Sequence, residues 1–264
     1  MTRFVVALVL ALPAATWAAE PAALAKARAL YNAGSYDAAI DAASTARRDP
    51  TAVDAAALVL ARAHLERFRV AGAAEDLAAA RMTLSGVRSA ALSPRDQVDL
   101  LIGLGQTLYL SDSFGAAADV FDTALGRAAM LNARDRGKLL DWWATALDRQ
   151  ALARPSDRRA PVFSRIVGRM EEEVRSEPGS AIANYWLVVG IRGMGDLDRA
   201  WDAAVAGWVR ASTGTETADL RTELDRVVTE ALIPERSRTR PAREQADAAA
   251  AMRTEWDGVK NAWK

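Results

Sequence analysis

The sequence predicts an all-α protein made of stacked helical hairpins, an architecture known as an α-solenoid. Apolar residues recur at helical spacing from Ala22 onward, and short segments of Gly, Asp, Ser or Pro interrupt them. Alanine, the best helix former, makes up roughly a fifth of the 264 residues, and the residues that favour strands are sparse. The third observation is that one hairpin pattern recurs along the chain.

The composition excludes several classes of function. The chain has no cysteine, which excludes a disulfide framework, a thiolate metal site and a cysteine nucleophile. A single histidine excludes a histidine-rich metal site, and we expect neither a metal nor a cofactor. The 34 basic and 34 acidic residues cancel, whereas surfaces that bind nucleic acid usually need a cationic excess. We therefore expect no nucleic-acid partner.

The first residues have the order of a secretory signal peptide. Arg3 precedes an uncharged run over residues 4–15, and small residues follow before the first acidic residue. Cleavage after Ala18 places small residues at the recognition positions, so we predict a signal peptide over residues 1–18 and a periplasmic or secreted protein. An uncleaved anchor is the alternative, but the run is shorter than the ~18–20 apolar residues that span a bilayer. After cleavage we expect no membrane span.

The clearest hairpin covers residues 101–125. Each of its two helices has an apolar face at helical spacing, and residues 111–113 form the turn between them. Gly105 and Ala117 are small residues on these faces, so they allow the two helices to approach closely. Residues 29–50 and 183–211 show the same pattern.

This pattern resembles the tetratricopeptide repeat (TPR), a helical hairpin with large, small and aromatic residues at set positions. The resemblance implies a right-handed solenoid of about five hairpins over residues 19–212, because one hairpin alone cannot bury its apolar face. An irregular helical bundle is the alternative. The small residue of each first helix recurs at intervals of 34, 44, 39 and 44 residues, against a family period of about 34. These positions are Ala27, Ala61, Gly105, Ala144 and Val188.

Two of the five hairpins are expected to contain insertions. In the second hairpin, residues 71–76 lengthen the loop between the helices. In the fourth, residues 151–161 form an inserted loop that includes Pro155. Of the four intervals, one is regular and three are expected to carry insertions.

Residues 213–264 depart from the repeat pattern and form a predicted C-terminal helical extension. A helix over residues 216–233 is expected to stop at Pro234, and a basic connector follows. The last helix, over residues 242–263, carries two tryptophan residues at heptad-like spacing. We predict that it caps the exposed end of the solenoid. The alternative is that the tryptophans form a stripe that binds a partner.

The remaining tryptophan residues from position 142 onward are predicted to pack between repeats. Their helical spacing favours a core position over a cage around a ligand. They are Trp142, Trp143, Trp186, Trp201 and Trp208.

The sequence contains no recognisable catalytic motif. Gly103-x-Gly105 lacks the third glycine and the preceding strand of a dinucleotide-binding motif. We expect His64, the only imidazole, to be buried and hydrogen-bonded rather than catalytic, because no acid in its hairpin is placed to reach it. Asp96 and Asp99 fall at a helix start, where carboxylates cap backbone amides. We therefore predict no catalytic residue and no enzymatic activity.

The resemblance also implies a binding groove. In TPR proteins, peptides lie along the concave face formed by the first helices of the hairpins. The corresponding partner-binding positions in this chain are Arg28, Tyr31, Asn32, Arg62, Glu66, Gln106, Tyr109, Asp141, Asp148, Tyr185 and Arg192. They combine aromatic rings with both signs of charge, which suits a polypeptide or a small polar ligand. The alternative is that they form only the hydrated face of a scaffold.

These features predict a non-enzymatic protein-binding or scaffold module of the bacterial cell envelope, with a polypeptide partner in the groove. The excess of Arg over Lys, together with the alanine content, suggests a bacterial genome rich in G and C. One alternative is an accessory protein of a solute transport system, which binds a small ligand or a transporter component. Another is an enzyme whose site is dispersed along the sequence. The sequence leaves the partner and the oligomeric state open.

Overall fold

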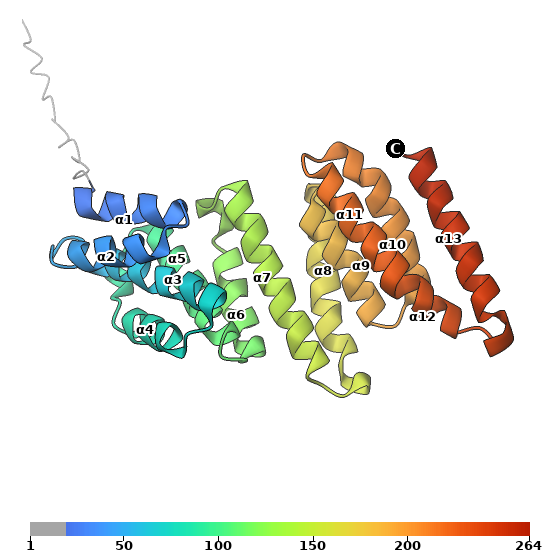
Figure 1. The fold of residues 1–264 in the computed structure, drawn as a ribbon, viewed down its shortest axis with the longest axis horizontal. Coiled ribbons are helices and arrows are strands. Elements are labelled where there is room, and N and C mark those ends of the chain that lie inside the picture. Colours follow the sequence, from blue (N-terminus) through green and yellow to red (C-terminus); the bar gives the residue numbers. More distant parts are fainter. Residues whose placement is uncertain (1–19) are drawn as a thin grey trace, which may run out of the picture.

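The computed structural model describes residues 20–264, and its regular elements in that range are all helical (Figure 1). The prediction of an all-α fold is confirmed. The predicted signal peptide, residues 1–18, lies outside the described residues. Consecutive helices pack in pairs: α1 (Ala22–Asn32) with α2 (Tyr36–Ala46), α3 (Val53–Ala71) with α4 (Ala74–Ser85), α5 (Pro94–Tyr109) with α6 (Phe114–Leu125), α7 (Ala133–Leu152) with α8 (Ala160–Ser176), and α9 (Ala181–Gly193) with α10 (Leu197–Arg210).

Five single-turn helices lie in the connections between the longer helices of the described chain. Two separate consecutive pairs, one lies inside the fourth pair, one follows the fifth pair and one precedes the last helix. They are η1 (Ser89–Ala91), η2 (Ala128–Met130), η3 (Ser156–Arg158), η4 (Ala211–Thr213) and η6 (Ala242–Glu244).

Four of the five pairs turn through a residue in the left-handed region. These residues are Gly34, Gly72, Asp112 and Gly195, with φ between 56° and 86°. A left-handed residue just past a helix end reverses the chain, and glycine adopts this conformation without a steric cost. The predicted turns at residues 34, 111–113 and 195 are therefore confirmed.

The second pair corrects one prediction. Residues 71–76 do not form a long loop, because α3 continues to Ala71 and α4 begins at Ala74. Gly72, in the left-handed conformation, allows the tight turn. The extra length of this unit lies instead in the 19 residues of α3 and in the connection that follows α4.

Small residues on the first helices lie where the helices meet. Ala27, Ala61, Ala144 and Val188 are each 0% exposed. At Gly105, an added Cβ would lie 2.4 Å from the ring of Phe121 on α6. The small residue at this position is therefore required by the close approach of α5 and α6.

The C-terminal extension differs from its predicted form. The helix α11 (Thr217–Val227) continues through a π-helical turn, Val228–Leu232, into α12 (Ile233–Arg238), so the expected stop at Pro234 is wrong. Proline is tolerated here because it occupies the first turn of α12, where its missing N–H is not needed. The last helix, α13 (Gln245–Ala262), lies along the outer side of this segment (Figure 1).

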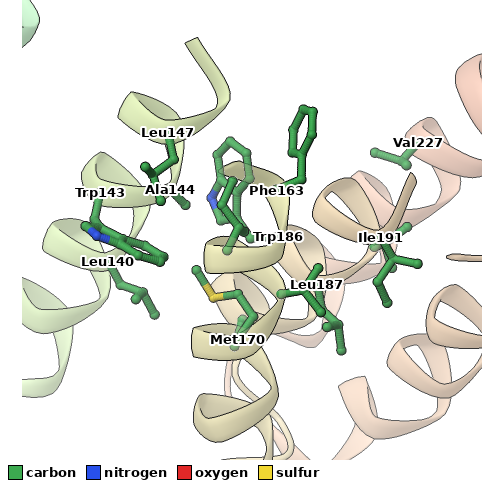
Figure 2. Packing of buried hydrophobic residues seen from close by; sticks show 14 of the residues in the cluster. Leu140, Trp143, Ala144, Leu147, Phe163, Met170, Trp186, Leu187, Ile191 and Val227 are labelled. Atoms are coloured by element: carbon green, nitrogen blue, oxygen red, sulfur yellow. The ribbon is translucent and has the colours of Figure 1, made fainter. Parts of the chain in front are cut away.

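Most of the tryptophan side chains are buried in one continuous core that extends from α5 to α13. Figure 2 shows Trp143 of α7 and Trp186 of α9 among the apolar side chains of α7, α8 and α9. Trp201 and Trp208 are also buried, as predicted, but Trp142 is only half-buried. Of the two tryptophans in the last helix, Trp256 is 1% exposed.

Candidate functional site

A cavity of about 770 Å³ lies between the first helices of the first four pairs, α1, α3, α5 and α7. Seven of the eleven predicted groove residues line it: Arg28, Tyr31, Asn32, Arg62, Glu66, Gln106 and Asp141. Twelve further residues line it, among them Arg69, Arg95, Asp99, Asp135, Lys138 and Trp142. The cavity therefore combines five basic with four acidic side chains.

The other four predicted groove residues lie outside the cavity. The ring of Tyr109 packs edge-on against the ring of Trp142, which lines the cavity, and the two ring centres are 5.0 Å apart. Asp148 and Tyr185 are half-buried on α7 and α9, and burial raises the pKa of both side chains. Arg192 donates two hydrogen bonds to Glu235 of α12, at 2.7 and 2.6 Å. The structure thus confines the cavity to the first four pairs.

Arg62 lies beside Gly103 of α5, where an added Cβ would make only ordinary contacts. A Cβ at Gly103 would lie 3.7 Å from Cγ of Arg62 and 3.4 Å from Leu84. The guanidinium of Arg62 lies 4.9 Å from the centre of the Tyr31 ring and 3.2 Å from Asp99 Oδ1. A stacked guanidinium of this kind gains a cation–π attraction while its charge remains available to a ligand.

Arg62 stays protonated and Tyr31 stays neutral near neutral pH, Arg62 through its neighbours and Tyr31 through burial. Burial acts to lower the pKa of Arg62, but Tyr31, Asp99 and Glu66 outweigh it and raise this pKa. Burial raises the pKa of the Tyr31 phenol, so it stays neutral. The cavity floor therefore presents a permanent positive charge and a neutral hydroxyl.

One end of the cavity, which we call the basic end, contains Arg62, Arg95, Lys138, Asp99 and Asp135. Arg95 bonds to Asp135 Oδ2 at 2.9 Å and lies 3.5 Å from Asp99 Oδ2. Burial acts to raise the pKa of Asp135, but Arg95, Lys138 and Arg62 outweigh it and lower this pKa. The basic end therefore holds three cations and two ionised carboxylates.

The interpretation of Asp96 and Asp99 as residues that cap the start of a helix is wrong. The cap of α5 is Ser93, whose Oγ accepts a hydrogen bond from Asp96 N at 3.1 Å. The carboxylate of Asp96 accepts a bond from Arg28 at 2.9 Å, and Asp99 faces Arg62 and Arg95. Both carboxylates are buried and paired with arginine, which is the usual condition for a buried charge.

The other end, which we call the acidic end, contains Glu66, Arg69, Gln106, Asp141 and Trp142. Arg69 bonds to Glu66 at 2.6 Å, and its guanidinium lies 5.3 Å from the centre of the Trp142 ring. This stack joins α3 to α7. Asp141 accepts a hydrogen bond from Trp186 Nε1 at 2.8 Å but has no basic partner within residues 20–264.

Gln106 has an unsatisfied polar group inside the cavity. Its side chain is 5% exposed, and its Oε1 is buried without a hydrogen-bond partner among the residues that the structure describes. Arg62 Nε is in the same condition, whereas Asp99 Oδ1 accepts no hydrogen bond from these residues but forms an ion pair with Arg62 at 3.2 Å. A buried acceptor without a donor costs about 1–3 kcal/mol, which a bound ligand or ordered water would recover.

His64 lies outside the cavity and forms a structural contact. Its Nδ1 is 2.7 Å from Asp76 Oδ1, so the expectation that no acid can reach it is wrong. Arg67 also bonds to Asp76, at 2.8 Å, and to Asp37 of α2, at 2.8 Å. The hydrogen bonds from Arg67, followed by that of His64, lower the pKa of Asp76. The group links α2, α3 and α4.

The missed cavity residues have a recognisable helical spacing. Arg95, Asp99 and Gln106 share one face of α5, four and then seven residues apart. Asp135, Lys138 and Trp142 share one face of α7 in the same way. Polar residues at this spacing on consecutive first helices are a signal that could have predicted a charged site. On α7 the signal is visible once the helix is taken to begin after its N-cap, Asn132.

No family model, curated protein or solved structure matches this chain. In residues 20–264, no helix combines the length and apolar character needed to cross a bilayer. The fold and the site together define an all-helical protein of consecutive helix pairs, with a cavity of mixed charge between its first four pairs.

Proposed function

We propose that this chain is a non-enzymatic binding module that takes a short polar segment of a polypeptide partner into the cavity. The observation that carries the proposal is Gln106, a nearly buried amide whose oxygen has no donor among the described residues and which lies in a cavity rich in charged groups. Polypeptide backbones offer both N–H donors and C=O acceptors, which suit Gln106 and the free Nε of Arg62.

We further propose that the helix pairs form a TPR-like right-handed α-solenoid and that the protein works in the bacterial cell envelope. The recurring left-handed turns and the buried small residues of the first helices support the repeat architecture. The order of charge, apolar run and small residues over positions 1–18 supports export and a periplasmic or secreted location.

A second candidate is an accessory protein of a solute transport system. The specific observation in its favour is the size of the cavity, about 770 Å³, within the range of about 300–1,000 Å³ common for small-molecule sites. The Arg69–Trp142 stack and the Arg95–Asp135 bond lie toward its two ends and limit its length.

A fluorescence anisotropy assay tests the polypeptide proposal. We expect labelled peptides from a short-peptide library to bind the wild-type chain, and Gln106→Leu to weaken the bound peptides at least tenfold while helical circular dichroism is unchanged. Lys26→Ala is the control, because Lys26 is exposed on α1 and does not line the cavity. If no peptide binds but a metabolite panel raises the melting temperature, the solute candidate replaces the proposal.

A further inference from the structure

The two ends of the cavity carry opposite net charge. At the basic end, Arg62, Arg95 and Lys138 outnumber the carboxylates of Asp99 and Asp135. Lys138 is exposed and makes no ion pair within the described range. A single anionic group would therefore complete the charge balance at this end.

The acidic end has the opposite excess. Glu66 and Asp141 are balanced there only by Arg69, which is already bonded to Glu66. Gln106 Oε1 adds a buried acceptor that lacks a donor among residues 20–264. A cationic group with N–H donors satisfies both conditions at once.

The helix geometry gives the distance between the two ends. Arg62 and Glu66 are four residues apart on α3, and Lys138 and Asp141 are three residues apart on α7, which corresponds to about 5–6 Å along each helix axis. An extended peptide advances about 3.3 Å per residue, so a chain of about two residues spans this distance. A single amino acid, whose charged groups are only two bonds apart on Cα, is too short to reach both ends.

We propose that the ligand of the cavity is a zwitterionic peptide of about two residues. Its C-terminal carboxylate lies between Arg62 and Lys138, its N-terminal ammonium faces Glu66 and Asp141, and a backbone N–H donates to Gln106 Oε1. This assignment rests on the proposed polypeptide-binding function and narrows it from an internal segment to a free short peptide.

Isothermal titration calorimetry with four forms of each peptide tests the assignment. The panel consists of dipeptides with varied side chains, each with free ends, with an amidated C-terminus, with an acetylated N-terminus, and with both caps. We expect the free form to bind most tightly and each cap to weaken binding at least tenfold. Pentapeptides with free ends should bind more weakly than dipeptides, since they cannot place both ends.

Two variants assign each cap to its end of the cavity. In Lys138→Ala, C-terminal amidation should weaken binding less than in the wild type, because only Arg62 remains to bind the carboxylate, while N-terminal acetylation keeps its full effect. In Glu66→Gln, where Asp141 remains, the reverse pattern is expected. Lys26→Ala, with an exposed α1 lysine outside the cavity, should retain both effects.

The possible failures are distinguishable. Equal binding of free and doubly capped dipeptides would overturn the end recognition and leave the polypeptide-binding function standing. Binding of no peptide, capped or free, would overturn both. If a cap effect keeps its full size in the variant that should reduce it, the orientation proposed for the ligand is wrong.

Discussion

Gly105 shows how one residue sets the distance between two helices. A Cβ there would lie 2.4 Å from the Phe121 ring, whereas the exposed Gly168 of α8 has no atom within 4 Å of such a Cβ. We expect Gly105→Ala to lower the free energy of unfolding by about 1–3 kcal/mol, because the buried ring must move. The matched change Gly168→Ala should raise it by up to about 1 kcal/mol, through helix propensity alone.

Urea denaturation followed by circular dichroism measures both changes in Gly105→Ala and Gly168→Ala. A Gly105→Ala variant at least as stable as the wild type would show that α5 and α6 can separate without loss. The close packing inferred at this position would then be wrong.

At the scale of single elements, α13 is held by one buried ring and one carboxylate. Trp256 packs edge-on against Trp201 and Trp208, with ring centres 6.0 and 5.4 Å away. Asp225 of α11 accepts hydrogen bonds from Trp256 Nε1 at 2.7 Å and from Lys260 Nζ at 2.9 Å. These contacts support a capping role for α13, and they use the ring of Trp256 that the alternative assigned to a partner.

We expect acid to loosen α13 through Asp225. Burial acts to raise the pKa of Asp225, but the hydrogen bonds from Lys260 and Trp256 outweigh it, so this pKa lies below its usual value. A carboxyl whose pKa is lower in the folded state stabilises the fold above the unfolded pKa of about 4, and this stability is lost as the pH falls through the folded value.

Tryptophan fluorescence between pH 7 and pH 2 measures this loosening. Asp225→Asn should lower the melting temperature at pH 7 and show a smaller further loss on acidification than the wild type does. A wild-type melting temperature that falls with acid no more steeply than that of Asp225→Asn would contradict the role of this carboxylate.

The elements differ in how much of them local sequence signals could predict. The helix pairs around Gly34 and Gly195 could be predicted from the sequence, because a turn residue and an apolar stripe are both local signals. Pro234 misled the prediction, because proline ends a helix interior but not the first turn after a π-helical step. Asp99 was interpreted as a cap because one of its partners, Arg62, lies on α3 and comes close only when the helices pack together. Its other partner, Arg95, is four residues earlier on α5 and was a local signal that the interpretation missed.

Of the two tryptophans that the alternative interpretation assigned to a partner, Trp263 is the one that remains exposed. Its side chain is 53% exposed, while its backbone oxygen accepts hydrogen bonds from Arg221 at 2.6 Å and Trp208 at 3.3 Å. The end of the chain is thus anchored through its backbone, and its side chain contributes little to the core. Sequence spacing alone could not separate Trp256 from Trp263, because it does not show where the supporting helices end.

Across the whole molecule, the core is unevenly distributed. The largest cluster extends from α5 to α13 and contains the buried tryptophans. The cluster under α1, α2 and the start of α3 consists mainly of alanine, with only three larger buried side chains, Leu24, Val59 and Leu60. Since the stabilisation from burial scales with apolar area, the first helix pair is held more weakly than the others.

This uneven core links stability to binding, since α1 supplies Arg28, Tyr31 and Asn32 to the cavity. In amide hydrogen exchange followed by mass spectrometry, we expect α1 and α2 of the free chain to exchange fastest among the paired helices and α7 to α9 to exchange slowest. A ligand that binds the cavity only when α1 is folded must stabilise α1 by mass action. A saturating peptide should therefore slow exchange in α1 and α2 more than in α9 and α10. Uniform exchange across all helices of the free chain would mean that the molecule opens as one cooperative unit. Equal protection of α1 and α10 by the peptide would mean that the peptide binds outside the cavity.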